Sequence, residues 1–169
     1  ARINSLPVSE TLAMAAKARE LKNQGIDIIG LSLGEPDFNT PEFIKDAAID
    51  AVNENWNSYS PVDGYADLKE AICKKFKRDN GLDYKPSQVV VSTGAKQSIA
   101  NLCMVLLDPG DEVLLPAPYW VSYSAIATLA EAKSIIIPST IETDFKITPE
   151  QLEAAITPKT KLVMFNSPN

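Results

Sequence analysis

Histidine is absent from the 169 residues of this chain, and that absence removes several classes of catalytic site at once. A Ser-His-Asp triad, a Cys-His pair, an HExxH zinc helix and a histidine-based proton shuttle all require an imidazole ring. Any chemistry carried by these residues must therefore come from carboxylates, lysines, tyrosines, backbone amides or a bound cofactor.

Cysteine is nearly as scarce, since only Cys73 and Cys103 are present. Their positions match neither a CxxC motif nor the spacing of metal ligands, so the sequence predicts no metal site. Both fall on segments expected to be helical, where a buried, reduced thiol is the expected state. Reduced thiols are typical of a reducing compartment, and we expect a cytoplasmic protein.

Long apolar runs and clustered positive charge are also missing. No run approaches the length of a transmembrane helix, and charged residues occur throughout the first thirty positions. The net charge is −6, and no stripe of lysine and arginine offers counterions to a phosphate backbone. We therefore expect no nucleic-acid partner and no membrane association.

The first half of the chain is expected to form helices joined by turns. Ser9 is placed to cap a helix over Thr11–Asn23, and Gly25 is placed to end it with a positive φ angle. Asp27–Leu33 has the apolar pattern of a short buried strand. Two more helices are expected, one from Thr40-Pro41 to about Asn53 and one with the apolar stripe Leu68, Ile72 and Phe76 that closes at Asn80-Gly81.

From Val89 onward, short runs rich in Val, Ile and Leu alternate with helical segments. This alternation predicts right-handed crossovers and a mainly parallel sheet covered on both faces. Thr148-Pro149-Glu150-Gln151 has the form of a capping box with proline at the first helical position. The expected strands are Val89–Ser92, Glu112–Leu115, Ser134–Ile137 and Lys161–Phe165, and the expected helices are 95–107, 119–130 and 149–156.

The chain ends with Asn166-Ser167-Pro168-Asn169, directly after an expected strand. A parallel strand at the end of a domain normally has a following helix or a neighbouring strand to cover it, and the expected sheet has open edges. We therefore expect the sequence to be an interrupted part of a longer fold.

The best local signal for chemistry lies where the strand expected at Val89–Ser92 meets the next helix. Gly94 allows a ligand to approach closely, and Ser92, Thr93 and Lys96 offer further donors around a helix N-terminus suited to phosphate. The helix dipole contributes only about 0.3–1 kcal/mol, so several amides must converge. An ordinary strand–turn–helix corner remains the alternative, because neither a Walker loop nor GxGxxG is present.

Two other segments follow expected strands and have similar alternatives. Leu31–Phe38 contains Gly34 followed by a proline, which suits either close approach by a ligand or a structural turn. Pro116–Trp120 lies at the carboxyl end of a strand, where Trp120 either faces a ligand or simply packs. Two charged segments are expected to carry no chemistry, the turn Asp108–Asp111 and the solvated cluster Lys74, Lys75, Lys77 and Arg78.

Taken together, these segments resemble class I aminotransferases, and most closely the bacterial-type aspartate aminotransferase subgroup. The similarity runs in order along essentially the whole chain, without a large gap. The resemblance implies a three-layer α/β sandwich with a mainly parallel sheet, in which 1–55 form the N-terminal arm and part of a small domain and 56–169 begin the cofactor-binding large domain. The strings that carry the resemblance are Ser32–Phe38, Tyr59–Pro61, Ser92–Gln97, Asp108–Val113, Pro116–Tyr123 and Asn166–Asn169.

The resemblance implies pyridoxal 5'-phosphate as the cofactor and assigns residues to it. The turn formed by Gly94, Ala95 and Lys96 resembles the one whose backbone amides hold the cofactor phosphate. Trp120 matches the aromatic residue that stacks on the pyridine ring and borders the substrate. Tyr59 matches a tyrosine that reaches the phosphate of the partner subunit, which implies a homodimer with a shared active site.

On the substrate side, Gly34 matches the glycine beside the substrate carboxylate, and Ala1–Pro7 matches an arm that packs on the partner subunit. Asn169 resembles the residue just before the family's Asn-Pro-Thr-Gly. The family's Schiff-base lysine, pyridinium-binding aspartate and carboxylate-binding arginine have no counterpart here, and Lys96 occupies a phosphate-loop position instead. We therefore assign no catalytic residue to this chain, and we expect it to be inactive by itself.

The expected function of the complete protein is transfer of an amino group from an L-amino acid, with aspartate as the leading candidate, to a 2-oxo acid such as 2-oxoglutarate. An aromatic, prephenate or alanine aminotransferase is an alternative within the same fold. A non-catalytic ligand-binding module of the same kind, or a complete phosphate-binding protein of this length, is an alternative of another class.

Overall fold

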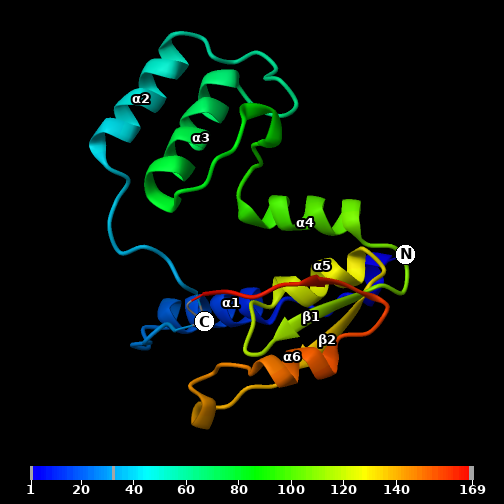
Figure 1. Cartoon of the computed structure of the whole chain (residues 1–169). Coiled ribbons are helices and arrows are strands. Elements are labelled where there is room, and N and C mark those ends of the chain that lie inside the picture. The colour runs from blue at the N-terminus through cyan, green and yellow to red at the C-terminus, as the bar shows by residue number, and fades with distance from the viewer. Residues whose placement is uncertain (1, 32, 168–169) are drawn as a thin grey trace. The chain divides into compact units, whose positions relative to one another are not determined.

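The computed structural model describes residues 2–31 and 33–167, and the chain divides into two compact units (Figure 1). Unit 1 consists of Ala1–Ile26 and Thr93–Asn169, and unit 2 consists of Asp27–Ser92. These units reflect contacts within this chain alone. The domain boundary expected near residue 56 concerns the complete fold and stays a prediction.

Unit 1 is built around a three-stranded sheet whose strand order is β2-β1-β3. Both neighbours of the central strand run parallel to it. The strands lie within two residues of the runs predicted for the second half of the chain, so the predicted α/β fold with a parallel sheet is confirmed. Their bounds are Glu112–Pro116 for β1, Lys133–Ile137 for β2 and Thr160–Val163 for β3.

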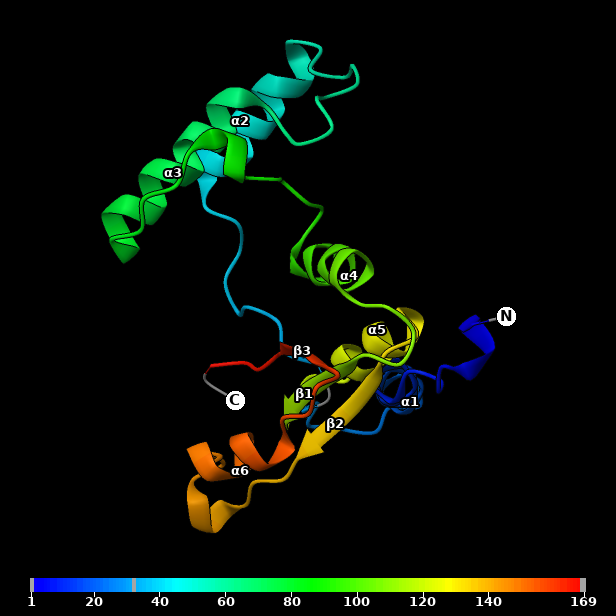
Figure 2. The same ribbon diagram turned by 45° about the vertical axis from the view of Figure 1, so that its right-hand side comes forward.

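The helices of unit 1 cover both faces of this sheet. The first crossover runs from β1 through α5 to β2, and the second runs back from β2 through α6, past β1, to β3. Because the two crossovers run in opposite directions along the sheet, right-handed connections place α5 and α6 on opposite faces (Figures 1 and 2). Helix α4 packs on α5. The helices of this unit are η1 (Arg2–Ser5), α1 (Glu10–Asn23), α4 (Ala95–Leu106), α5 (Ser122–Leu129), η3 (Ile141–Thr143) and α6 (Pro149–Ala155).

Local capping signals in unit 1 behave as the sequence predicts. The Ser9 hydroxyl accepts a hydrogen bond from the Leu12 amide and caps α1. Thr148 and Gln151 form the predicted reciprocal capping box, with bonds of 2.8 and 3.2 Å. The helix expected over 119–130 begins later than predicted, at Ser122, because Tyr119–Val121 form the turn that leads from β1 into α5.

The core of unit 1 forms around β1. Val113, Leu114 and Leu115 have no exposed surface, as expected for a central strand that is covered on both faces. On the α5 side, Val113 and Leu115 pack with residues of α4 and α5, among them Cys103 and Tyr123. At the start of β1, the buried carboxylate of Glu112 accepts a hydrogen bond of 2.6 Å from the Thr157 hydroxyl.

Unit 2 contains α2 (Glu42–Asn53), α3 (Ala66–Asn80) and the short helix η2 (Pro86–Gln88). As predicted, α3 closes at Asn80-Gly81, and Gly81 adopts the left-handed conformation at φ 69°. The stripe residue Phe76 meets the ring of Tyr84 edge-on, with 5.8 Å between the ring centroids. Of the side chains that the structure describes, all the buried ones lie in unit 1, so unit 2 has a thin core.

Two predicted strands are wrong. The described residues of Asp27–Leu33 form no strand, and Ile29 and Leu31 are 86% and 92% exposed; Ser32 lies outside the described residues. Val89–Ser92 is also irregular, although its Val91 amide donates to the Asp63 carbonyl over 3.1 Å. An apolar run becomes a strand only where a neighbouring backbone pairs with it, and the part of the chain described here provides no such partner for either run.

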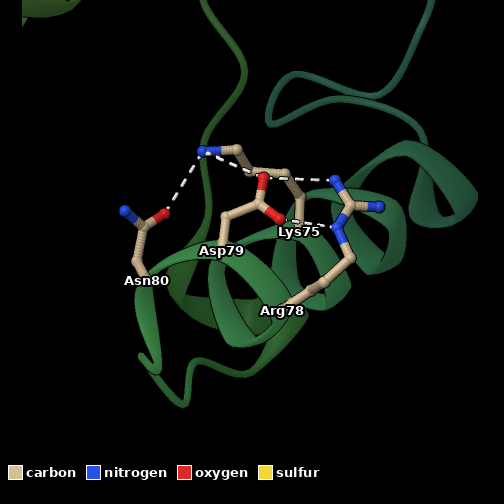
Figure 3. A network of polar contacts seen from close by, with 4 residues as sticks. All are labelled: Lys75, Arg78, Asp79 and Asn80. Carbon is tan, nitrogen blue, oxygen red and sulfur yellow. Dashed lines mark hydrogen bonds and ion pairs between the residues drawn. The ribbon is translucent and has the colours of Figure 1, made fainter.

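The basic residues of α3 form the solvated surface that the sequence predicts. Figure 3 shows Asp79 accepting from the Arg78 guanidinium at 2.6 Å, and the Lys75 ammonium lies 3.7 Å from the same carboxylate. The hydrogen bond from Arg78 is the main cause that holds the pKa of Asp79 below its usual range. Lys77 pairs with Asp83 at 2.6 Å. These contacts neutralise much of the local charge, and such exposed pairs contribute little to stability.

Replacement of Gly64 by alanine is expected to destabilise unit 2. The new Cβ would lie 2.6 Å from Cγ2 of Val91, and φ at Gly64 is +99°, a conformation that alanine strains to adopt. We expect the free energy of unfolding to fall by about 1–3 kcal/mol, measured by urea titration of the protein. Gly81→Ala is the matched control, because its φ is positive but nothing lies within 4 Å of the added carbon. An equal loss in both variants would contradict the steric part of this prediction.

The two cysteines are expected to differ in reactivity. Both are free, but Cys103 has no exposed surface whereas Cys73 is only half-buried, which corrects the expectation that both are buried. Burial raises the pKa of the Cys103 thiol, so its reactive thiolate is scarcer at any given pH. A thiol reagent followed by peptide mass mapping should modify Cys73 first, and Cys103 only on unfolding. Equal labelling of the native protein would contradict the packing of α4.

Candidate functional site

The first part of the candidate site is the N-terminus of α4. Gly94 precedes the helix at φ 83°, carries no side-chain cap, and leaves open space where a Cβ would stand. The first amides of a helix lack partners within it, so those of Ala95 and Lys96 are available to a ligand at this end of α4. The Thr93 amide is already bound by the Gln97 side chain, which folds back over the turn. The arrangement suits a small anion, with amides rather than side chains as the main donors.

The second part is the indole ring of Trp120 in the turn between β1 and α5. The ammonium of Lys96 lies 4.8 Å from the centre of this ring, within the range of a cation–π contact. The indole is 38% exposed and therefore presents an accessible aromatic surface. The structure thus brings together the predicted cofactor residues Gly94, Ala95, Lys96 and Trp120 within unit 1.

Tyr123 and Asn166 also belong to this site, although neither was predicted from the sequence to be part of it. The Tyr123 ring meets that of Trp120 edge-on at 5.6 Å and 87°. Its hydroxyl donates a hydrogen bond to Oδ1 of Asn166, a residue 43 positions further along the chain. One signal in the sequence could have identified Asn166. It directly follows an expected strand, and the carboxyl end of that strand lies at the same sheet edge as Pro116–Trp120.

The other predicted positions cannot be joined to this arrangement. Gly34 and Tyr59 belong to unit 2, where both are exposed, and their substrate and cofactor roles stay predictions. Asn169 lies outside the described residues. Across 2–31 and 33–167, no cluster of three or more acidic or cysteine side chains is arranged to bind a metal. Over the same ranges, no helix is long and apolar enough to cross a membrane.

Comparison with known proteins identifies the class of this fold. A model of the family described as aminotransferase class I and II matches residues 26–169. The chain belongs to the class I and II aminotransferase family. It spans less than half the length of the curated relatives, 42% and 43% of the two reported next.

The relatives are aspartate aminotransferases by name. The chain is 52% identical over 168 residues to the aspartate/prephenate aminotransferase of Nitrosomonas europaea, and 54% identical to the aspartate aminotransferase of Geobacillus stearothermophilus, with 99% of this chain covered in each. The solved aspartate aminotransferase from Rhizobium meliloti superposes with a TM-score of 0.93 at 48% identity, covering 100% of this chain and 42% of that one. The Thermus thermophilus enzyme with maleate gives 0.95 at 43%, covering 99% and 44%.

The contact between Lys96 and Trp120 is expected to have a measurable coupling energy. Lys96→Met removes the charge and keeps much of the stem, while Trp120→Leu removes the ring. A double-mutant cycle on the free energy of unfolding should give a coupling of about 0.5–1 kcal/mol, as for a partly exposed cation–π pair. Lys161→Met, on an exposed lysine of β3, is the matched control and should not couple to Trp120. A coupling near zero for Lys96 would contradict the contact.

Proposed function

We propose that the protein containing this chain transfers the amino group of an L-amino acid, aspartate in the first place, to 2-oxoglutarate with pyridoxal 5'-phosphate as cofactor. The observation that carries the proposal is the adjacency of an open helix N-terminus, the Lys96 ammonium and the Trp120 ring in unit 1. The names of the relatives support both the reaction and the choice of aspartate.

The residues present fit this cofactor. Its dianionic phosphate requires several convergent donors and a positive charge, which the first amides of α4 and the nearby Lys96 provide. The space at Gly94 is open, so a phosphate oxygen can approach the backbone there. The pyridine ring requires a flat apolar surface, and the partly exposed indole ring of Trp120 offers one.

We assign the roles of this chain's residues accordingly. The amides of Ala95 and Lys96 bind the phosphate and fix the position of the cofactor, and Trp120 packs against its ring and excludes water from that side. Gly34 leaves room for the substrate carboxylate. When bound, the cofactor supplies the electron-withdrawing ring that makes the substrate's Cα–H acidic. The group that moves this proton lies outside these 169 residues, and Lys96 serves only the phosphate.

We further propose a cytoplasmic homodimer in which Tyr59 reaches the cofactor phosphate of the partner subunit. The support from this chain is the full exposure of the Tyr59 side chain, which leaves its hydroxyl accessible to another subunit. The two free thiols are consistent with a reducing compartment.

A second substrate has specific support. The relative from Nitrosomonas europaea is named an aspartate/prephenate aminotransferase, and so is that from Cereibacter sphaeroides, to which this chain is 54% identical. Prephenate is therefore the second amino-group acceptor we propose. Comparison of the kcat/KM values for 2-oxoglutarate and prephenate in the complete protein decides between a single and a dual acceptor.

The proposal is tested by reduction of the protein with borohydride in the presence of pyridoxal 5'-phosphate, followed by intact mass and peptide mapping. We expect one pyridoxyl group per chain, attached to a lysine outside residues 1–169. Lys96→Met should reduce the affinity for the cofactor, because it removes a positive charge from the proposed phosphate site, and it should keep the attachment site, because Lys96 is assigned no role in the Schiff base. The control Lys161→Met should change neither. Attachment to Lys96 would disprove the assigned roles, and absence of any stoichiometric adduct would disprove the proposed function.

A further inference from the structure

We propose that Tyr123 and Asn166 form a positioning pair that fixes the orientation of the Trp120 ring. This inference rests on the proposed function, because the ring orientation matters there for stacking on the cofactor. Neither residue is assigned to bind the cofactor or the substrate. Both act through Trp120, because they hold its indole ring in one orientation before any ligand binds.

The first step is that Tyr123 holds Trp120 in two ways. The Tyr123 amide donates to the Trp120 carbonyl over 2.9 Å, which closes the turn that enters α5. The two rings then meet edge to face, at 5.6 Å and 87°. This geometry is favourable for aromatic pairs because the positive edge of one ring faces the negative face of the other. A rotation of either ring would lose it.

The second step is that Tyr123 is itself held in the core. Its side chain is 6% exposed and packs in the core cluster with Val113, Leu115 and Ile126. Such a buried hydroxyl needs a hydrogen-bond partner, and Oδ1 of Asn166 accepts from it. The hydrogen bond selects one orientation of the phenol, and the phenol in turn selects one orientation of the indole.

The third step is that Trp120 lacks comparable support on its own. The indole is 38% exposed, and besides Tyr123 it contacts the flexible side chain of Lys96. Asn166 belongs to the segment just after β3, whereas Trp120 follows β1. The hydrogen bond from Tyr123 to Asn166 therefore connects the region after β1 with the segment after β3, and these two strands are neighbours. In this way the pair sets the Trp120 ring relative to the edge of the sheet.

The experiment uses the complete protein labelled with 5-fluorotryptophan and freed of cofactor. The Trp120 resonance in the ¹⁹F spectrum is assigned by its loss in Trp120→Phe. Tyr123→Phe removes only the hydroxyl. Asn166→Ala removes the side-chain amide that accepts from it, and because Asn166 is exposed, this second variant still tests the pair if the first fails to fold. Each substitution should shift or broaden the Trp120 resonance, and the double variant should change it no further. The Trp56 resonance, from unit 2, should stay in place.

The same variants are then titrated with pyridoxal 5'-phosphate by absorbance. We expect the dissociation constant to rise about threefold to tenfold, the effect of one net hydrogen bond. Tyr119→Phe is the matched control, because Tyr119 packs against the same cluster and should leave the constant unchanged.

The outcomes separate this inference from the proposed function. An unchanged Trp120 resonance in Tyr123→Phe and Asn166→Ala overturns the pair, whatever the protein binds. Wild-type protein that binds the cofactor, with both variants equal to it, also overturns the pair while the proposed function stands. Failure of the wild type to bind pyridoxal 5'-phosphate overturns the proposed function and with it the cofactor half of this inference, and the ¹⁹F spectra then decide the ring-positioning half.

Discussion

Burial of β1 on both faces is the constraint on which unit 1 depends. A central parallel strand must find a strand on each side and helices above and below, because its amides and its apolar side chains have no access to water. Val113, Leu114 and Leu115 meet all of these requirements without any exposed surface. Truncation of one such buried side chain to alanine typically lowers the free energy of unfolding by about 2–5 kcal/mol. This short strand is therefore an important part of the stability of unit 1, and it fixes the positions of β2, β3, α5 and α6 together.

The candidate site follows from the same constraint. Parallel strands place their carboxyl ends at one edge, so the turn after β1 and the segment after β3 meet there although they are far apart in the chain. Helix α4 packs on α5, and the start of α4 thereby comes within reach of Trp120. The core of unit 1 holds the site residues in place. The residues at the edge of the sheet provide unpaired helix amides, one ammonium group and one aromatic ring.

Local signals were readable from the sequence, and long-range partners were not. The Ser9 cap, the Thr148 capping box and the end of α3 at Gly81 depend on a few neighbouring residues, and all three are confirmed. The runs at 27–33 and 89–92 failed as strands because pairing depends on a distant backbone. Motif resemblance singled out Gly94, Lys96 and Trp120, whose cofactor roles stay predictions, but the hydrogen bond between Tyr123 and Asn166 joins positions that no local pattern connects.

The discontinuity of unit 1 has a consequence for biosynthesis. Residues 1–26 pack with a segment that begins only at Thr93, and the whole of unit 2 is translated between them. This N-terminal segment, whose η1 contacts α5, therefore leaves the ribosome long before the strands and helices of its unit. Closing so long a loop carries an entropic cost and slows folding, so the assembly of unit 1 is a late event whereas the contiguous segment 27–92 is free to form local contacts early.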